Sequence, residues 1–296
     1  MWIRINDVSY NFYPNAMSRR KTREGYFRLA HTMFGLNFDK WYDSGFWSRD
    51  RFIPYVLYHK GVAVSSVGVC VNEVQWQNTT QRYAQISTVM TLPEYRRRGL
   101  NRWLMEYVLR EWRDYCDAIY LLGNDSVVDF YPKFGFEEFT EYDFTVPVRK
   151  AKGEVKKLDI NELEDLVILV QKYRESNPFA ALKVNNISQM LFHCMQFLSD
   201  DIFYVEQYDA VAIVRHRGNK MTCYDVFASA NCRLDDILGV LANESTEYAQ
   251  LGFTPKDLET CTVVESQEED NHLYVLPGKS NIFRDHQVMF PLLSRA

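Results

Sequence analysis

The chain has 296 residues, which is enough for one large domain or for two domains of ordinary size. Hydrophobic residues make up 47% and charged residues 25% of it, a composition typical of soluble globular proteins. No apolar run approaches the roughly 18 residues that a membrane helix needs, and the first residues lack the apolar core of a secretory signal. We therefore expect a cytoplasmic protein with no membrane partner.

The charge is unevenly divided along the chain. Residues 1–150 carry 20 Lys and Arg against 17 Asp and Glu, whereas residues 151–296 carry 14 against 22, for a net charge of −5. A protein that binds nucleic acid normally has a broad basic surface, so this balance argues against a nucleic-acid partner. The six cysteines are scattered, without a CxxC pair or a His at metal-ligand spacing. We expect reduced thiols and no metal site.

The first third of the chain predicts a strand, a helix and three antiparallel strands. Residues 2–10 alternate as in a strand, and Ser18–Leu36 has the apolar spacing of a helix. Short polar turns then separate three β-rich segments, which implies hairpin pairing. These segments are Ile53–His59, Val62–Trp76 and Arg82–Thr91.

The aromatic segment at residues 37–47, NFDKWYDSGFW, lies between the first helix and these strands. It has two interpretations. It is a loop that caps a core, or it is one wall of an acceptor pocket, since such pockets are largely aromatic with a few polar groups.

The stretch Ala84–Asn101, AQISTVMTLPEYRRRGLN, joins the third of these strands to an amphipathic helix through a proline turn and an arginine-glycine loop. Leu104, Val108 and Trp112 form the apolar side of the helix. Backbone N–H groups at a helix start, together with nearby cations, favour a bound phosphate. Taken alone, the basic run could equally be a solvated turn.

Three further features complete the first half. Asp117–Leu122 is a short apolar strand, a second short helix follows Asn124, and Glu141–Val148 is expected to close the unit as a strand. The charged stretch Lys150–Lys157 is the best candidate for a boundary between two domains. We therefore predict two domains, residues 1–150 and 151–296.

The second half repeats this order of elements weakly. We expect helices at Asn161–Arg174 and Leu234–Glu247, and the predicted strands are Ile202–Val205, Ala210–His216, Met221–Phe227, Tyr248–Phe253 and Gln287–Leu293. The segment ASANCRLDD takes the place of the arginine-glycine loop. We expect a smaller domain of the same architecture that has lost the phosphate site.

Two motifs together resemble the GNAT superfamily of N-acetyltransferases. Thr91–Asn101 is similar to the family's acyl-CoA-binding motif, with matches at Pro93, Tyr95, Arg96, Gly99 and Leu100. NDSVVDFYPKFGF, residues 124–136, is similar to the later motif N-x-x-A-x-x-F-Y-x-K-x-G-F, with a valine where alanine is usual. The whole of residues 1–148 fits this pattern. The resemblance implies an α/β (α+β) fold, a mixed and mostly antiparallel sheet flanked by helices, with acetyl-CoA as co-substrate.

The resemblance also implies the roles of individual residues toward acetyl-CoA. The pantetheine arm would lie along the strand end, the pyrophosphate would sit at the loop, and a glycine without a side chain permits close approach of the backbone. Asn101 departs from the family's small residue, so the pyrophosphate would pack less closely there. The implied contacts are Val89, Met90, Thr91, Arg96, Arg97, Arg98, Gly99, Leu100, Asn101, Arg102 and Asn124.

Tyr131 corresponds to the family tyrosine that protonates the leaving thiolate, since a phenol stays protonated at neutral pH. The other interpretation of Tyr131 is a core aromatic whose hydroxyl bonds to the backbone. Asn124 could equally cap a helix. A general base is not assigned from the sequence. Many members place a glutamate in the region where Gln85 stands. Glu73 or a water relay are the candidates in its place, and His31 and His59 are weaker candidates.

The sequence thus predicts an N-acetyltransferase that moves an acetyl group directly to a primary amine of a small molecule or peptide. Two alternatives remain open. One is a non-catalytic acyl-CoA-binding sensor or scaffold, which the missing glutamate favours and Tyr131 disfavours. The other is a nucleic-acid-binding module that uses Arg96–Arg98, which the acidic total disfavours. The sequence predicts neither the acceptor nor the oligomeric state.

Overall fold

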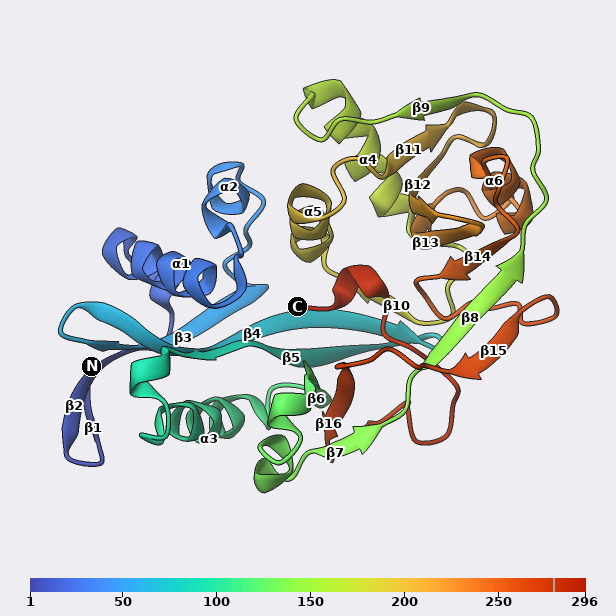
Figure 1. Cartoon of the computed structure of the whole chain (residues 1–296). Coiled ribbons are helices and arrows are strands. Elements are labelled where there is room, and N and C mark those ends of the chain that lie inside the picture. The colour runs from blue at the N-terminus through green and yellow to red at the C-terminus, as the bar shows by residue number, and fades with distance from the viewer. Residues whose placement is uncertain (279) are drawn as a thin grey trace.

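The computed structural model describes residues 1–278 and 280–296, which build two β-sheets with helices packed on them (Figure 1). The first sheet runs in the order β1-β2-β3-β4-β5-β6-β16-β7, and β10 pairs with the far end of β4. Among the described strands of this sheet, only β5 and β6 pair in parallel, and the other neighbours are antiparallel. The bounds are β1 Trp2–Ile5, β2 Val8–Tyr13, β3 Phe52–His59, β4 Val62–Trp76, β5 Thr79–Thr91, β6 Ala118–Gly123, β7 Glu137–Phe139, β10 Lys183–Asn185 and β16 His272–Leu276.

Helices cover both faces of the first sheet. In Figure 1, α1 (Arg20–Phe34) and α2 (Phe38–Asp43) lie on one face, and α3 (Leu100–Trp112) lies on the other. β5 serves both layers: Ile86 packs in the cluster under α3, whereas Met90, beyond an irregularity in the pairing with β4, packs with α1 and α2. The expected helix at 18–36 and the hairpin-linked strands are therefore confirmed.

The second sheet has the order β15-β8-β14-β13-β12-β11-β9 and carries α4, α5 and α6. Its elements are β8 Tyr142–Pro147, β9 Val155–Lys157, α4 Leu163–Glu175, α5 Ile187–Gln196, β11 Ile202–Val205, β12 Ala210–Arg217, β13 Lys220–Phe227, α6 Leu234–Leu241, β14 Tyr248–Leu251 and β15 Thr262–Glu265. None of the helices that the structure describes is long and apolar enough to cross a membrane.

The two sheets exchange a strand, which corrects the expectation that Glu141–Val148 closes the first unit. This segment forms β8, but β8 pairs with β14 and β15 in the second sheet. In return β16 enters the first sheet between β6 and β7. Tyr274 and Val275 of β16 are buried in two different clusters, as a strand covered on both faces requires.

The strand predicted at Gln287–Leu293 is not formed. The backbone amides of this segment bond to irregular partners instead, since Met289 N donates to Thr254 Oγ1, Phe290 N to Glu141 and Leu292 N to Gly252 O. The segment leads into a short 3-10 helix at Leu292–Ser294, which lies beside α5 near the middle of the first sheet (Figure 1). In this segment, these specific hydrogen bonds outweigh the local β propensity.

The strand exchange predicts that residues 1–150 do not form a stable unit by themselves. A 1–150 fragment lacks β16, leaving β6 with an open edge and the Tyr131 cluster without Tyr274 and Leu276. We expect the fragment to lose cooperative thermal unfolding by circular dichroism, while the full chain retains it. A fragment that unfolds cooperatively near the temperature of the full chain would contradict this.

Candidate functional site

The site begins where the two parallel strands part. β5 and β6 pair from Tyr83–Ala118 to Ile86–Leu121, and β5 then continues to Thr91 without β6 beside it. β6 continues to Gly123, paired on its other edge with β16. The carboxyl ends of parallel strands that diverge are the usual place of a ligand crevice in α/β folds.

A β-bulge helps β5 turn away. Between the pairs Gly68–Ser87 and Ser66–Met90, β5 has one residue more than β4, and Thr88 there takes a left-handed backbone with φ of 43°. The hydroxyl of Thr88 lies 3.0 Å from that of Tyr26 on α1. Bulges bend a strand and re-aim its side chains, and they occur often beside active sites.

The arginine-glycine loop presents free backbone amides at the start of α3. Arg97 and Gly99 both have positive φ, 59° and 79°, and Leu100 opens the helix. The first amide to bond into the helix is that of Trp103, which donates to Gly99 O at 3.0 Å. Among the residues that the structure describes, no acceptor meets the amides of the three preceding positions, so they can bind an anion.

Four arginines surround these amides, and three of them are held by the protein. Arg96 Nε donates to Thr91 O at 3.4 Å, Arg98 donates to Glu94 O at 2.7 Å, and Arg102 pairs with Glu106 at 3.0 Å. Arg97 is exposed and makes no hydrogen bond within residues 1–278 and 280–296. Its guanidinium is therefore available to a phosphate.

The side chain of Asn101 turns toward the sheet. Its Oδ1 lies 2.7 Å from Ser65 Oγ and 2.8 Å from Thr91 Oγ1, which joins the start of α3 to β4 and β5. The side chain thus takes a structural role beside the loop. Met90 buries its side chain on the α1 face, and Val89 packs toward α3, so the backbone of this strand end is the part available to a ligand.

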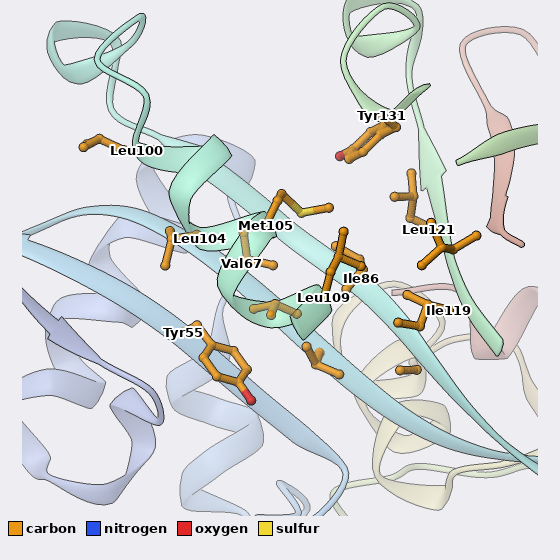
Figure 2. Close-up of a cluster of buried hydrophobic side chains, with 14 of the residues drawn as sticks. Tyr55, Val67, Ile86, Leu100, Leu104, Met105, Leu109, Ile119, Leu121 and Tyr131 are labelled. Carbon is orange, nitrogen blue, oxygen red and sulfur yellow. The ribbon is translucent and has the colours of Figure 1, made fainter. Parts of the chain in front are cut away.

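Tyr131 lies beyond the end of the other strand, β6, and the divergence between the ends of β5 and β6 is called the crevice. Tyr131 stands in a 3-10 helix, Tyr131–Phe134, eight residues after β6, and its ring packs among Phe130, Phe136 and Tyr274. Figure 2 shows the ring projecting toward the side of Met105, with the hydroxyl foremost. In the described chain this hydroxyl bonds to no backbone group. Burial, with a smaller contribution from Tyr274, raises the pKa of Tyr131 above its usual value.

Asn124 follows β6 and caps the next turn. Its Oδ1 accepts hydrogen bonds from the backbone N of Ser126 at 3.2 Å and from the Ser126 hydroxyl at 2.6 Å. The capping interpretation is confirmed. The side-chain NH₂ group stays exposed on the crevice strand, so a contact with the pantetheine arm remains a prediction.

On the opposite face of the sheet a small cavity of about 50 Å³ reaches the bulge. Phe38 and Trp41 from the aromatic segment line it together with Ser87 and Thr88, and both aromatic rings are also buried in the core under α1. The segment at 37–47 therefore caps the core, with Phe38–Asp43 as a helix instead of the expected loop, and it also lines a cavity; its role as a wall of an acceptor pocket stays a prediction. Arg51, Arg295 and Ala296 complete one side of the cavity.

The sequence interpretation missed the role of the segment 294–296. Gln85 stands in the region where many family members have a glutamate, and its side-chain amide lies between Ser294 and Ala296. The amide nitrogen donates to Ser294 O at 2.9 Å, and the amide oxygen accepts from Ala296 N at 2.9 Å. Arg295 between them pairs with the buried Glu141 at 3.1 Å. Nothing in the local sequence pairs Gln85 with a segment some 200 residues away, so only the fold reveals this contact.

The substitute bases do not gather at the crevice. Glu73 forms an ion pair with Arg51 at 2.9 Å and lies opposite Arg82 on β5. At ~3.3 Å per residue, Glu73 is about 16 Å along β4 from Gly68, which lies beside the bulge. His59 lies at the loop end, with Nδ1 3.0 Å from the Tyr95 hydroxyl. His31 is exposed in the last turn of α1. A general base is still unassigned.

Comparison with known proteins finds a family match in the first half of the chain. Residues 18–136 match the model of the Acetyltransferase (GNAT) family. This part of the chain is therefore similar to a GNAT acetyltransferase domain. The matched span contains the arginine-glycine loop and Tyr131, which flank the crevice, and the aromatic segment on the opposite face of the sheet.

Solved structures extend the likeness of fold over most of the chain. A probable N-acyltransferase of unknown function from Enterococcus faecalis matches with a TM-score of 0.60 and 15% identity, over 90% of this chain and 72% of its own. A GCN5-related N-acetyltransferase from Kribbella flavida matches with a TM-score of 0.55 and 15% identity, over 90% of this chain and 70% of its own. Eis1 from Mycobacterium abscessus matches with a TM-score of 0.55 and 13% identity, over 89% of this chain and 72% of its own. These identities show the fold alone. No curated protein matches the sequence.

The loop geometry predicts that Arg97→Ala weakens coenzyme A binding by roughly 5- to 20-fold at low salt, since one charge-assisted phosphate contact is lost. The difference should shrink as salt is raised. Isothermal titration of coenzyme A measures both effects. Arg113→Ala, an exposed arginine at the far end of α3, is the matched control and should bind as the parent does. Equal affinities for both variants would contradict the placement of the phosphates.

Proposed function

We propose that this protein is an acetyl-CoA-dependent N-acetyltransferase that transfers the acetyl group directly to a primary amine of a small molecule or peptide. One observation supports this above all. The parting of β5 from β6 lies between the unbonded amides at the start of α3 and the free hydroxyl of Tyr131. An acyl-CoA whose phosphates bind to these amides would present its thioester sulfur to the Tyr131 hydroxyl.

The cofactor would bind in three parts. Its pyrophosphate would meet the amides and cations of Arg97–Arg102, with Arg96 beside them. Its pantetheine arm would extend as an extra strand along Val89–Thr91, where β5 lacks a neighbour, and would reach Asn124 from the other side. A backbone N–H of β5 could then stabilise the negative charge that develops on the thioester oxygen.

The reaction would proceed through attack by a neutral amine on the thioester carbonyl. The C–N bond forms, the C–S bond breaks, and the thiolate takes the proton of the Tyr131 hydroxyl. The raised pKa of this phenol keeps its proton in place at neutral pH, so the group can serve as an acid. The amine's own proton leaves to water or to a base still to be identified.

The acceptor would approach from the face of α1 and α2. The cavity there is lined by Phe38, Trp41 and Phe52 next to the bulge residues Ser87 and Thr88, which favours an amine on a narrow apolar group. The acidic excess of residues 151–296 would also attract a cationic acceptor. In that case the acceptor KM rises steeply with salt, and a salt-insensitive KM would argue against the attraction.

A screen of amines against acetyl-CoA, followed by thiol release, tests the activity itself. Free amino acids, peptide N-termini, polyamines and aminoglycosides form the first panel. Coenzyme A binding without turnover on any amine would favour the alternative of a non-catalytic sensor. Gel-shift binding of nucleic acid that coenzyme A displaces would favour the basic-module alternative.

We expect the Tyr131→Phe substitution to lower kcat by about 100-fold or more across the neutral pH range, because the thiolate then leaves unprotonated. Coenzyme A affinity should stay within about twofold of the parent. Tyr10→Phe is the matched control, because Tyr10 is a buried tyrosine of the same hydrophobic cluster and lies on β2, away from the crevice. Unchanged turnover in Tyr131→Phe would remove the acid role.

A further inference from the structure

The second sheet repeats the parting of strands seen in the first. β13 and β14 pair in parallel from Lys220–Tyr248 to Cys223–Leu251, and β13 then continues to Phe227. β13 also has one extra residue opposite β12, immediately after that last pair. Asp225 stands two residues beyond the last parallel pair, as Thr88 does in β5. The second domain has kept the bulge and the divergence of strands.

The helix that follows is unsuited to phosphate. α6 begins after Arg233 without a glycine, and its first turn carries Asp235 and Asp236. Carboxylates at a helix start occupy the electrostatic place of an anion and repel another. A ligand at this second parting therefore differs in charge from coenzyme A.

A cavity of about 450 Å³ opens at this second parting. It is bounded by β13, the end of α4, the following loop and β10, with Asp225, Phe227, Tyr173, Asn177 and Lys183 among its lining residues. This volume lies in the range of small-molecule sites, and the mixture of aromatic and polar groups is typical of them. None of these residues belongs to the acetyltransferase crevice.

Asp225 offers one carboxylate oxygen to the cavity. Its Oδ1 accepts hydrogen bonds from Asn177 Nδ2 at 2.7 Å and from Val226 N at 2.9 Å. Its Oδ2 accepts none from the residues described. Burial raises the pKa of Asp225 to about 7, although both hydrogen bonds and Lys183 oppose the change. A cationic donor from a ligand would supply the missing partner and favour the ionised form.

A positive group lines the same cavity. Lys183 on β10 has no ion-pair partner in residues 1–278 and 280–296. Burial and the nearby Lys256 lower its pKa, and the charge of Asp225 opposes this change without a direct contact. Arg174 at the end of α4 lines the cavity as well and is exposed. An anionic group of a ligand would compensate the charge of Lys183. The cavity thus presents an unmet acceptor and an unmet cation to one occupant.

We infer that the cavity at the second parting binds a small zwitterion, an α-amino acid being the simplest kind, with its ammonium group at Asp225 and its anionic group toward Lys183. This site is separate from the proposed acetyltransferase centre and stands whether or not that activity is found. Occupancy would add to the contacts that already join these elements, since Tyr173 of α4 packs on Phe227 of β13 and donates to Asn185 of β10.

Titration calorimetry of the full chain with each common amino acid tests the inference. We expect saturable binding of at least one, and at least tenfold weaker binding of the same compound after N-acetylation, which removes the ammonium charge. Asp225→Asn keeps an oxygen for Asn177 and Val226 and should weaken binding by tenfold or more. Lys183→Met should weaken it too. Asp236→Asn, an exposed carboxylate on α6, is the matched control and should bind as the parent does.

The pH dependence gives a second readout. The titratable groups facing Asp225 are Lys183 on β10, Tyr173 on α4, Cys194 on α5 and Cys223 on its own strand. Burial raises the pKa of the tyrosine and of both thiols, so these three stay neutral. As pH rises through about 7, Asp225 ionises and affinity should increase roughly fivefold or more from pH 5.5 to 7.5.

Three results would overturn the inference. They are an absence of binding across the amino-acid panel, equal binding by Asp225→Asn, and binding that Tyr131→Phe abolishes. The last would assign the amino acid to the acetyltransferase crevice as an acceptor. Loss of thiol release with intact amino-acid binding would instead reject the proposed activity alone.

Discussion

The divergence of β5 from β6 is the constraint on which the rest of the site depends. It has two causes on the two strands. The extra residue at Thr88 bends β5, and pairing with β16 holds β6 on its own course. Each parallel strand therefore ends in a different environment, one beside the loop before α3 and the other beside Tyr131. A straight pair of strands would satisfy the backbone of both and leave no edge for an extended ligand.

The sequence was sufficient wherever the signal was local. The hairpin strands, the helix opened by Gly99 and the motif around Tyr131 depend on residues close together in the chain, and all three are found in the structure. The same reasoning failed for Glu141–Val148 and Gln287–Leu293. Propensity indicates that a segment can be a strand, but the pairing partner is set by burial against distant residues, such as Leu251 against Phe144.

The candidate site divides in the same way. The positions of the loop arginines and of Tyr131 beside the diverging strands were predictable because short motifs indicate them, whereas their roles toward acetyl-CoA stay predictions. The engagement of Gln85 by Ser294 and Ala296 was not, because hydrogen bonds between a strand and a segment some 200 residues later leave no periodic pattern. Asn101 lies between these cases. Its identity was a visible departure from the motif, yet only the positions of Ser65 and Thr91 explain why an amide suits that place.

The exchanged strands also set an order for folding during synthesis. β6 ends at Gly123, but its antiparallel neighbour β16 ends at Leu276. At roughly 5–20 residues per second, a ribosome needs about 8 to 30 s to make the intervening chain. Through that time the edge of β6 and the apolar surface that Tyr274 and Leu276 later cover are open to other chains. Completion of the first sheet therefore waits until nearly the whole chain has been made.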